Sequence, residues 1–213
     1  MADPATLQAI AREIHQGRYD EAAGQCLSIL RQDPRDAPVI ALYGELALQM
    51  GRIEDAIVIL RKLLALAPDH AGAHENLALA YNLEGDYSNA RDHALRALEL
   101  KEDSVESRLV LGTILVSEGK DDEALQHIDE ARALTYGDPR VEKIYIDSLL
   151  NMGRFSTAHE LLKELIALYP EDSYLYKQFA GSYRFTGQDA EAQLVRSLAN
   201  SEGELALEGN PAD

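Results

Sequence analysis

The sequence contains no tryptophan, a single cysteine and few basic residues. Cys26 cannot form a disulfide within the chain, and its place in an apolar pattern with Leu27 and Ile29 predicts a small buried side chain in a reducing compartment. The 20 Lys and Arg face 37 Asp and Glu, which gives a net charge of −17. Because nucleic-acid affinity depends on basic residues that replace counterions, this balance argues against nucleic acid and anionic membranes as partners.

Long apolar runs are also missing. No segment approaches the roughly 18 uninterrupted apolar residues of a membrane span. The N-terminus lacks the basic start and apolar stretch of an export signal, so we expect a cytoplasmic protein without membrane insertion. A Gly-rich phosphate loop, a His-Glu-x-x-His motif, paired cysteines and a Gly-x-Ser-x-Gly motif are all absent. The sequence therefore predicts a protein that is not an enzyme and needs no cofactor.

One alanine and one glycine recur at a fixed interval along the chain. The alanines are 34 residues apart, at Ala22, Ala56, Ala90, Ala124, Ala158 and Ala192. A glycine stands five residues before each of them, at Gly17, Gly51, Gly85, Gly119, Gly153 and Gly187. Six repeats thus share one register without insertion or deletion, and such a period is typical of helical repeat proteins.

Each repeat contains two predicted helices, one on either side of the glycine. Apolar residues follow helical spacing in both halves, as in Ile53, Ile57 and Leu60 of the second repeat. Glycine adopts the left-handed conformation of a helix end at little cost, so it predicts the end of the first helix. Short oxygen-bearing residues then fall where the second helices begin and are predicted to cap them: Asp20, Ser88, Asp122 and Ser156.

The pattern is clearest in the second and third repeats, which contain Tyr43-Gly44, Gly51, Ala56, Leu60 and Pro68, then Leu77-Ala78, Tyr81, Gly85 and Ala90. These residues resemble the tetratricopeptide repeat family. The resemblance implies an all-α fold, a right-handed superhelical solenoid of six helix-turn-helix repeats whose first helices line a concave, peptide-binding face. The domain would span residues 3–204, with repeats at 3–36, 37–70, 71–104, 105–138, 139–172 and 173–206 and a flexible tail at 205–213.

A small residue is expected where the two helices of a hairpin cross, because a larger side chain would overpack a close contact. Four first helices supply one, at Gly44, Ala78, Gly112 and Ala180. The first and fifth repeats have Ile10 and Ile146 at this step, so their hairpins are predicted to be splayed or repacked.

If the first helices line a concave side, three rows of side chains recur along it at the 34-residue interval. Apolar residues occupy the middle of these rows, at Leu42, Leu79, Leu109, Val110 and Ile144. A contiguous exposed patch of this kind would mark an interaction site. The alternative is that these side chains are buried between adjacent first helices. Polar candidates on the same rows are Glu45, Asn76 and Thr113.

Basic residues gather on the first helices of the last two repeats, at Arg140, Lys143, Lys177 and Arg184. They could hold carboxylates of a bound segment through charge-assisted hydrogen bonds. Alternatively, Glu142, Asp147 and Glu171 neutralise them as ordinary surface pairs. The predicted partner is a protein or peptide with apolar anchors and some acidic residues.

Histidine offers little for a metal site. His93 and His127 occupy the same step of successive second helices, on a face expected to be convex and solvated. No carboxylate or thiolate completes a ligand set, so no metal is predicted.

Three functions fit the sequence. The first is a non-catalytic scaffold for protein–protein interaction. The resemblance also allows a recruitment or regulatory region of a larger enzyme, such as a glycosyltransferase or a sulfotransferase. The third is a structural protein that assembles with itself as a homo-oligomer.

Overall fold

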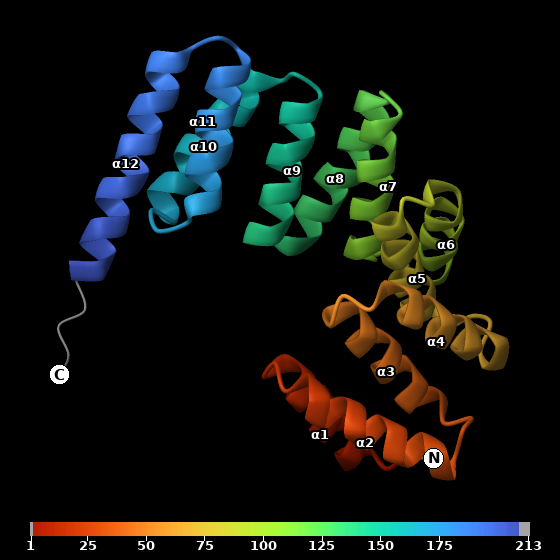
Figure 1. Cartoon of the computed structure of the whole chain (residues 1–213). Helices are drawn as coiled ribbons and strands as arrows, with labels where there is room; N and C mark the ends of the chain where they lie inside the picture. The colour runs from red at the N-terminus through yellow and green to blue at the C-terminus, as the bar shows by residue number, and fades with distance from the viewer. Residues whose placement is uncertain (1, 209–213) are drawn as a thin grey trace. The chain divides into compact units, whose positions relative to one another are not determined.

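The computed structural model describes residues 2–208, and their side chains as far as Ala199. This part of the chain is all-α and contains twelve helices in two compact units (Figure 1). The N-terminal unit, which ends at Thr135, holds α1 (Pro4–His15), α2 (Tyr19–Gln32), α3 (Ala37–Gln49), α4 (Ile53–Leu66), α5 (Ala71–Glu84), α6 (Tyr87–Leu100), α7 (Val105–Ser117) and α8 (Asp121–Thr135). The C-terminal unit begins at Tyr136 and holds α9 (Pro139–Asn151), α10 (Phe155–Leu168), α11 (Ser173–Phe185) and α12 (Asp189–Glu208). The predicted all-α helical repeat fold, with two helices per repeat, is confirmed.

The recurring glycine ends the first helix of every hairpin. All six of these glycines have a φ between 70° and 82°, the left-handed conformation that the sequence predicts. At Gly51 the turn is closed by two backbone hydrogen bonds, from Gly51 N to Leu48 O and from Arg52 N to Ala47 O. The chain therefore reverses direction at the same step of each repeat.

Each of the six first helices has a side-chain cap, whereas three of the second helices, α2, α4 and α10, have none. Asp3, Asp36, His70, Ser104, Asp138 and Asp172 each accept a hydrogen bond from a backbone N–H in the first turn of the helix that follows. The prediction of caps at Asp20, Ser88, Asp122 and Ser156 is wrong, because these residues lie inside the first turn of their helices. Asp86 is the N-cap of α6 and its side chain accepts from Asn89 N, whereas the N-cap residues of α2, α4 and α10 are arginines that make no such hydrogen bond.

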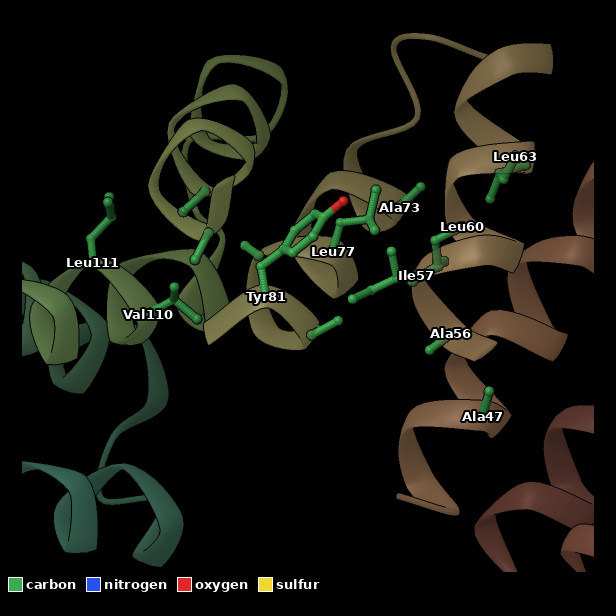
Figure 2. Close-up of a cluster of buried hydrophobic side chains, with 14 of the residues drawn as sticks. Ala47, Ala56, Ile57, Leu60, Leu63, Ala73, Leu77, Tyr81, Val110 and Leu111 are labelled. Carbon is green, nitrogen blue, oxygen red and sulfur yellow. The ribbon is translucent and has the colours of Figure 1, made fainter. Parts of the chain in front are cut away.

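In the N-terminal unit, consecutive first helices contact one another, whereas consecutive second helices have no close approach among the described residues. This arrangement puts α1, α3, α5 and α7 on the inner side of the unit. The main core of the unit runs from α3 to α7. Leu77 and Tyr81 of α5 lie between Ile57 of α4 and Val110 of α7 (Figure 2). Cys26 is fully buried, as predicted, and burial raises the pKa of its thiol to about 11.

How closely the two helices of a hairpin approach depends on the size of one residue at the point where they cross. A Cβ at Gly44 would lie 2.6 Å from a methyl carbon of Leu60, and one at Gly112 would lie 2.5 Å from Ile128 Cγ1. The α1–α2 and α9–α10 hairpins, which have the fully buried Ile10 and Ile146 at this step, approach less closely than the other four. The predicted splaying of the first and fifth hairpins is confirmed.

The C-terminal unit has a core rich in aromatic side chains. Phe179 and Tyr183 of α11 stack with ring centroids 5.0 Å apart, and the His159 ring of α10 lies 4.4 Å from that of Tyr183. Leu162 and Ile146 are fully buried beside them. The junction between α10 and α11 is thus filled by rings, where the N-terminal unit uses alanine and leucine.

At the C-terminal end, α12 extends to Glu208, so residues 205–208 of the predicted tail are helical. Residues 209–213 of that tail lie outside the described residues. Within residues 2–208, none of the helices has both the length and the apolar character needed to cross a bilayer.

Candidate functional site

The inner wall of the N-terminal unit is closed where the sequence predicts an exposed apolar patch. Leu109 and Val110 are each only 3% exposed, and Val110 belongs to the core shown in Figure 2. The expectation that these two residues are exposed is wrong, because α7 packs closely enough on α5 to cover them. For these two residues the alternative of burial between adjacent first helices is correct.

The other candidates of the N-terminal unit are half-buried. Leu79 packs against the main core and Leu42 against the smaller core that α1, α2 and α3 form. Glu45 and Asn76 keep part of their surface in solvent, as does Thr113, whose hydroxyl donates to the carbonyl oxygens of Leu109 and Val110. These five side chains offer a mixed surface without a dominant apolar anchor.

Two of the four basic candidates are held by their own unit. Lys143 Nζ lies 2.6 Å from Asp172 Oδ2 and 5.0 Å from the centre of the Tyr174 ring. Burial and a hydrogen bond with Asp147 raise the pKa of Tyr174, so this phenol stays neutral. Arg140 is exposed and its guanidinium approaches Asp138 at 4.0 Å. Lys143 and Arg140 thus lie beside Asp172 and Asp138, which are not among the carboxylates that the sequence suggested for this role, Glu142, Asp147 and Glu171.

The remaining two, Lys177 and Arg184, are exposed on α11, and neither is paired with a carboxylate in the described part of the chain. Among the twelve helices of residues 2–208, α11 alone has more basic than acidic residues. In a chain of net charge −17, this helix is a local exception. Anionic groups are therefore attracted here more than elsewhere on the first helices.

A cleft lies beside α11, on the side that faces α9 and the start of α10. It has a volume of about 320 Å³ and is lined by Leu150, Asn151, Phe155, Gln178, Gly181, Ser182 and Phe185. Phe185 is 82% exposed, and its ring lies 5.5 Å from that of Phe155. The exposed ring of Phe185 and the half-buried ring of Phe155, beside a concavity, form a contact surface for an apolar side chain. Ile144, the fifth apolar candidate, is half-buried on α9 and does not line this cleft.

Gly181 is exposed in the middle of α11, and nothing lies within 4 Å of the position that its Cβ would take. The packing of the chain therefore does not require glycine there, although glycine destabilises a helix interior by about 1 kcal/mol relative to alanine. Gly112 differs, because Ile128 fills the space of its missing side chain. A glycine without an internal reason on an exposed helix face suits the close approach of another backbone.

Sequence reasoning missed Leu150, Phe155 and Phe185. Phe185 could have been noticed, because no other repeat has an aromatic hydrocarbon ring at this position. The equivalent residues are His15, Gln49, Leu83, Ser117 and Asn151. Gln178 and Gly181 lie on the rows that the repeat register marks as inner-facing, so the register located the helix face but not the cleft.

His74 and His93 are packing residues at the contact between α5 and α6 rather than members of a solvated outer face. His74 Nε2 lies 2.9 Å from the carbonyl oxygen of Pro68 and must donate to it, which leaves Nδ1 to accept from His93 Nδ1 at 2.9 Å. The Tyr81 ring stacks on His93. The described residues contain no group of three or more His, Cys, Asp or Glu that could hold a metal ion.

A larger open cavity of about 560 Å³ lies in the N-terminal unit, lined by Glu102, Asp103, Arg108, Glu130, Ala133 and Leu134. Its one cation is already engaged, since Arg108 pairs with Glu130 and donates to the carbonyl oxygen of Glu102. The cavity offers neither an exposed aromatic ring nor a free cation, so the α11 cleft is the stronger candidate.

Comparison with known proteins agrees with the geometry. Two sequence profiles of the tetratricopeptide repeat match residues 13–80 and 84–139. A curated relative, cellulose synthase 2 operon protein C of Komagataeibacter xylinus, is 28% identical over 161 residues, which are 74% of this chain but only 12% of that protein. The chain therefore spans about an eighth of the length of this relative.

Solved structures share the fold. A tetratricopeptide repeat protein from Parabacteroides merdae superposes with a TM-score of 0.73 at 17% identity, over 93% of this chain and 78% of that one. YrrB, described as a TPR protein with an unusual peptide-binding site, superposes with a TM-score of 0.60 at 19% identity, over 83% of this chain and 91% of that one.

Proposed function

Because the chain belongs to the tetratricopeptide repeat family, we propose that it is a non-catalytic scaffold that binds a segment of a partner protein on the exposed face of α11. The single observation that carries the proposal is the cleft in which Phe185 is 82% exposed beside an unpacked Gly181. The cleft receives an apolar anchor of the partner. Lys177 and Arg184, on the neighbouring side of α11, attract acidic residues of the same partner segment.

The first helices of the N-terminal unit contribute a second, weaker contact region. Leu42, Glu45, Asn76, Leu79 and Thr113 keep part of their surface in solvent and belong to this region. Leu109 and Val110 are excluded because they are buried. Cytoplasmic location is part of the proposal, supported by the single buried cysteine, and fractionation of cells followed by immunoblotting checks it.

The experiment that tests the function is a selection of peptides from a random display library on the immobilised protein. Gly181→Trp fills the cleft without an internal clash, because nothing lies within 4 Å of the missing Cβ. Gly24→Trp on α2 is the matched control, since Gly24 is equally unpacked and exposed on a helix. We expect selected peptides to bind wild type and Gly24→Trp but not Gly181→Trp. A library that yields no binder, or binders indifferent to Gly181→Trp, would rule out this site.

A second candidate function is recruitment within a larger protein. The observation that favours it is the length of the cellulose synthase operon relative, of which the matching region is 12%. Detection of the native protein by immunoblotting decides between the two, because a much longer product would assign the repeats to a larger protein.

A further inference from the structure

The two long sides of α11 differ in chemistry. Lys177 and Arg184 are seven residues apart, which is about two helical turns, so they lie on the same side of the helix. Lys177 lines a small depression together with Arg196 and Ala199, which places this side toward α12. Gln178 and Phe185, displaced by one residue, line the cleft toward α9. Gly181 lies between the basic side and the apolar side.

The basic side is reinforced by α12. Arg196 is exposed and, like Lys177, has no carboxylate partner among the described residues. By contrast, Lys143 and Arg140 on α9 lie beside Asp172 and Asp138 of their own unit. The surface thus has a basic edge, formed by Lys177, Arg184 and Arg196, and an apolar edge, formed by the cleft. A ligand that matches both must carry acidic groups on one side and apolar groups on the other.

An extended polypeptide meets this requirement, because successive side chains of a strand point to opposite sides. A strand that runs along α11 over Gly181 presents every second side chain to the cleft and the others to the cations. Lys177 and Arg184 are about 10 Å apart along the helix axis. This separation lies between about 7 Å and about 14 Å, the distances at which side chains recur on one edge of a strand, and the long Lys and Arg side chains can span the difference. The missing side chain at Gly181 lets the strand backbone come close to the helix.

The amide side chains at the cleft favour an extended segment over a helical one. Asn151 and Gln178 both line the cleft, and each amide can donate to and accept from a backbone. An extended segment has unpaired N–H and C=O groups to offer, whereas a helix has already paired its own.

We infer that the partner segment is an extended stretch in which acidic and bulky apolar residues alternate, with its acidic edge on Lys177, Arg184 and Arg196 and its apolar edge in the cleft. This inference rests on the proposed function and specifies the ligand of that same site.

The test uses two labelled peptides of identical composition, measured by fluorescence anisotropy on the full chain. One has the alternating core Glu-Phe-Glu-Leu-Glu, and the other has the sorted core Glu-Glu-Glu-Phe-Leu. We expect the alternating peptide to bind about tenfold more tightly than its isomer, because the sorted peptide can satisfy only one edge at a time.

Charge variants test the basic edge. In the double variant Lys177→Gln and Arg184→Gln, the alternating peptide should bind about tenfold more weakly, which is the effect of losing two exposed ion pairs. The matched control is Arg61→Gln with Lys62→Gln on α4, where both residues are also exposed, and it should leave binding unchanged. Lys177→Glu with Arg184→Glu should instead prefer a Lys-Phe-Lys-Leu-Lys peptide.

Equal binding of the two isomers, full affinity in the double Gln variant, or no binding of the alternating peptide to wild type would each overturn the inference. Library peptides that bind in a Gly181-dependent way but lack acidic residues would overturn it while the proposed function stands. A library without binders would remove the proposed function itself, so the two failures are distinguishable.

Discussion

Residues at the same position of the repeat are buried on α7 of the N-terminal unit but reach solvent on α9 of the C-terminal unit. Val110 on α7 is 3% exposed, whereas Ile144, the next residue at this step, is half-buried on α9. One step earlier, Leu109 is buried while Lys143 pairs with Asp172 near the surface. Sequence register alone therefore does not decide whether an inner-facing side chain is core or contact surface.

The difference follows from how closely the helices approach. In the N-terminal unit, small residues at the crossings bring the helices of three hairpins together, and neighbouring first helices cover one another's side chains. In the C-terminal unit, Ile146 separates α9 from α10, and rings rather than alanines fill the junction with α11. The C-terminal unit retains a cleft beside the exposed Phe185, whereas the N-terminal unit has a core that runs from α3 to α7.

The strongest test of this contrast places a carboxylate at the same step of each unit. Val110→Glu should lower the free energy of unfolding by about 4 kcal/mol, because it buries an unpaired charge. Ile144→Glu should cost about 1 kcal/mol or less, since the carboxylate can reach water. Urea denaturation followed by circular dichroism measures both. Similar losses in the two variants would mean that the units are equally packed at this step.

The second test concerns the residue that separates α9 from α10. Ile146→Ala should destabilise the chain by about 3 kcal/mol, although alanine occupies this step in α5 and α11, because the splayed helices leave a cavity around the shortened side chain. Thermal and urea unfolding measure the loss, with the half-buried Ile144→Ala as control. A loss below about 1 kcal/mol would show that α10 can close onto α9.

The repeat register predicted much of this fold from the sequence. It located the helix ends at the glycines, and the size rule at the crossings predicted the splayed hairpins at Ile10 and Ile146. The repeat register did not predict the burial of Val110, because burial at this position depends on how closely neighbouring helices approach and not on the residue itself. It also did not reveal the cleft, since Leu150, Phe155 and Phe185 come from three helices whose proximity has no sequence signature.

A third test compares two glycines in the middle of helices. Gly112→Ala should destabilise the N-terminal unit by about 2 kcal/mol, because its Cβ would lie 2.5 Å from Ile128 Cγ1. Gly181→Ala should stabilise the C-terminal unit by about 1 kcal/mol, because nothing lies within 4 Å and alanine favours helix. Denaturation midpoints check the two signs. A destabilising Gly181→Ala would show that Gly181 is required by internal packing.

The smallest expected effect is a pH dependence of the N-terminal unit. Burial and the neighbouring His74 lower the pKa of His93, with Asp92 acting in the opposite direction and Arg61 adding to the decrease. The folded chain therefore binds fewer protons than the unfolded chain below pH about 6.5, so stability is lost as the pH falls through the folded pKa.

His93→Gln isolates this contribution from those of His127 and His159, whose pKa values burial also lowers. Urea midpoints between about pH 7.5 and about pH 5 should fall less in His93→Gln than in wild type. An identical pH profile in the two proteins would exclude His93 as the responsible group.

The six left-handed glycines have a consequence for how such a chain can change length. In every repeat the first helix ends at a glycine turn in the same position. Removing or duplicating a 34-residue block therefore joins two equivalent positions of the repeat and leaves the local backbone conformation unchanged. Recombination between the repeats within one gene can therefore lengthen or shorten the protein by whole hairpins. The cleft beside α11 is unchanged by such an event when the block lies in the N-terminal unit.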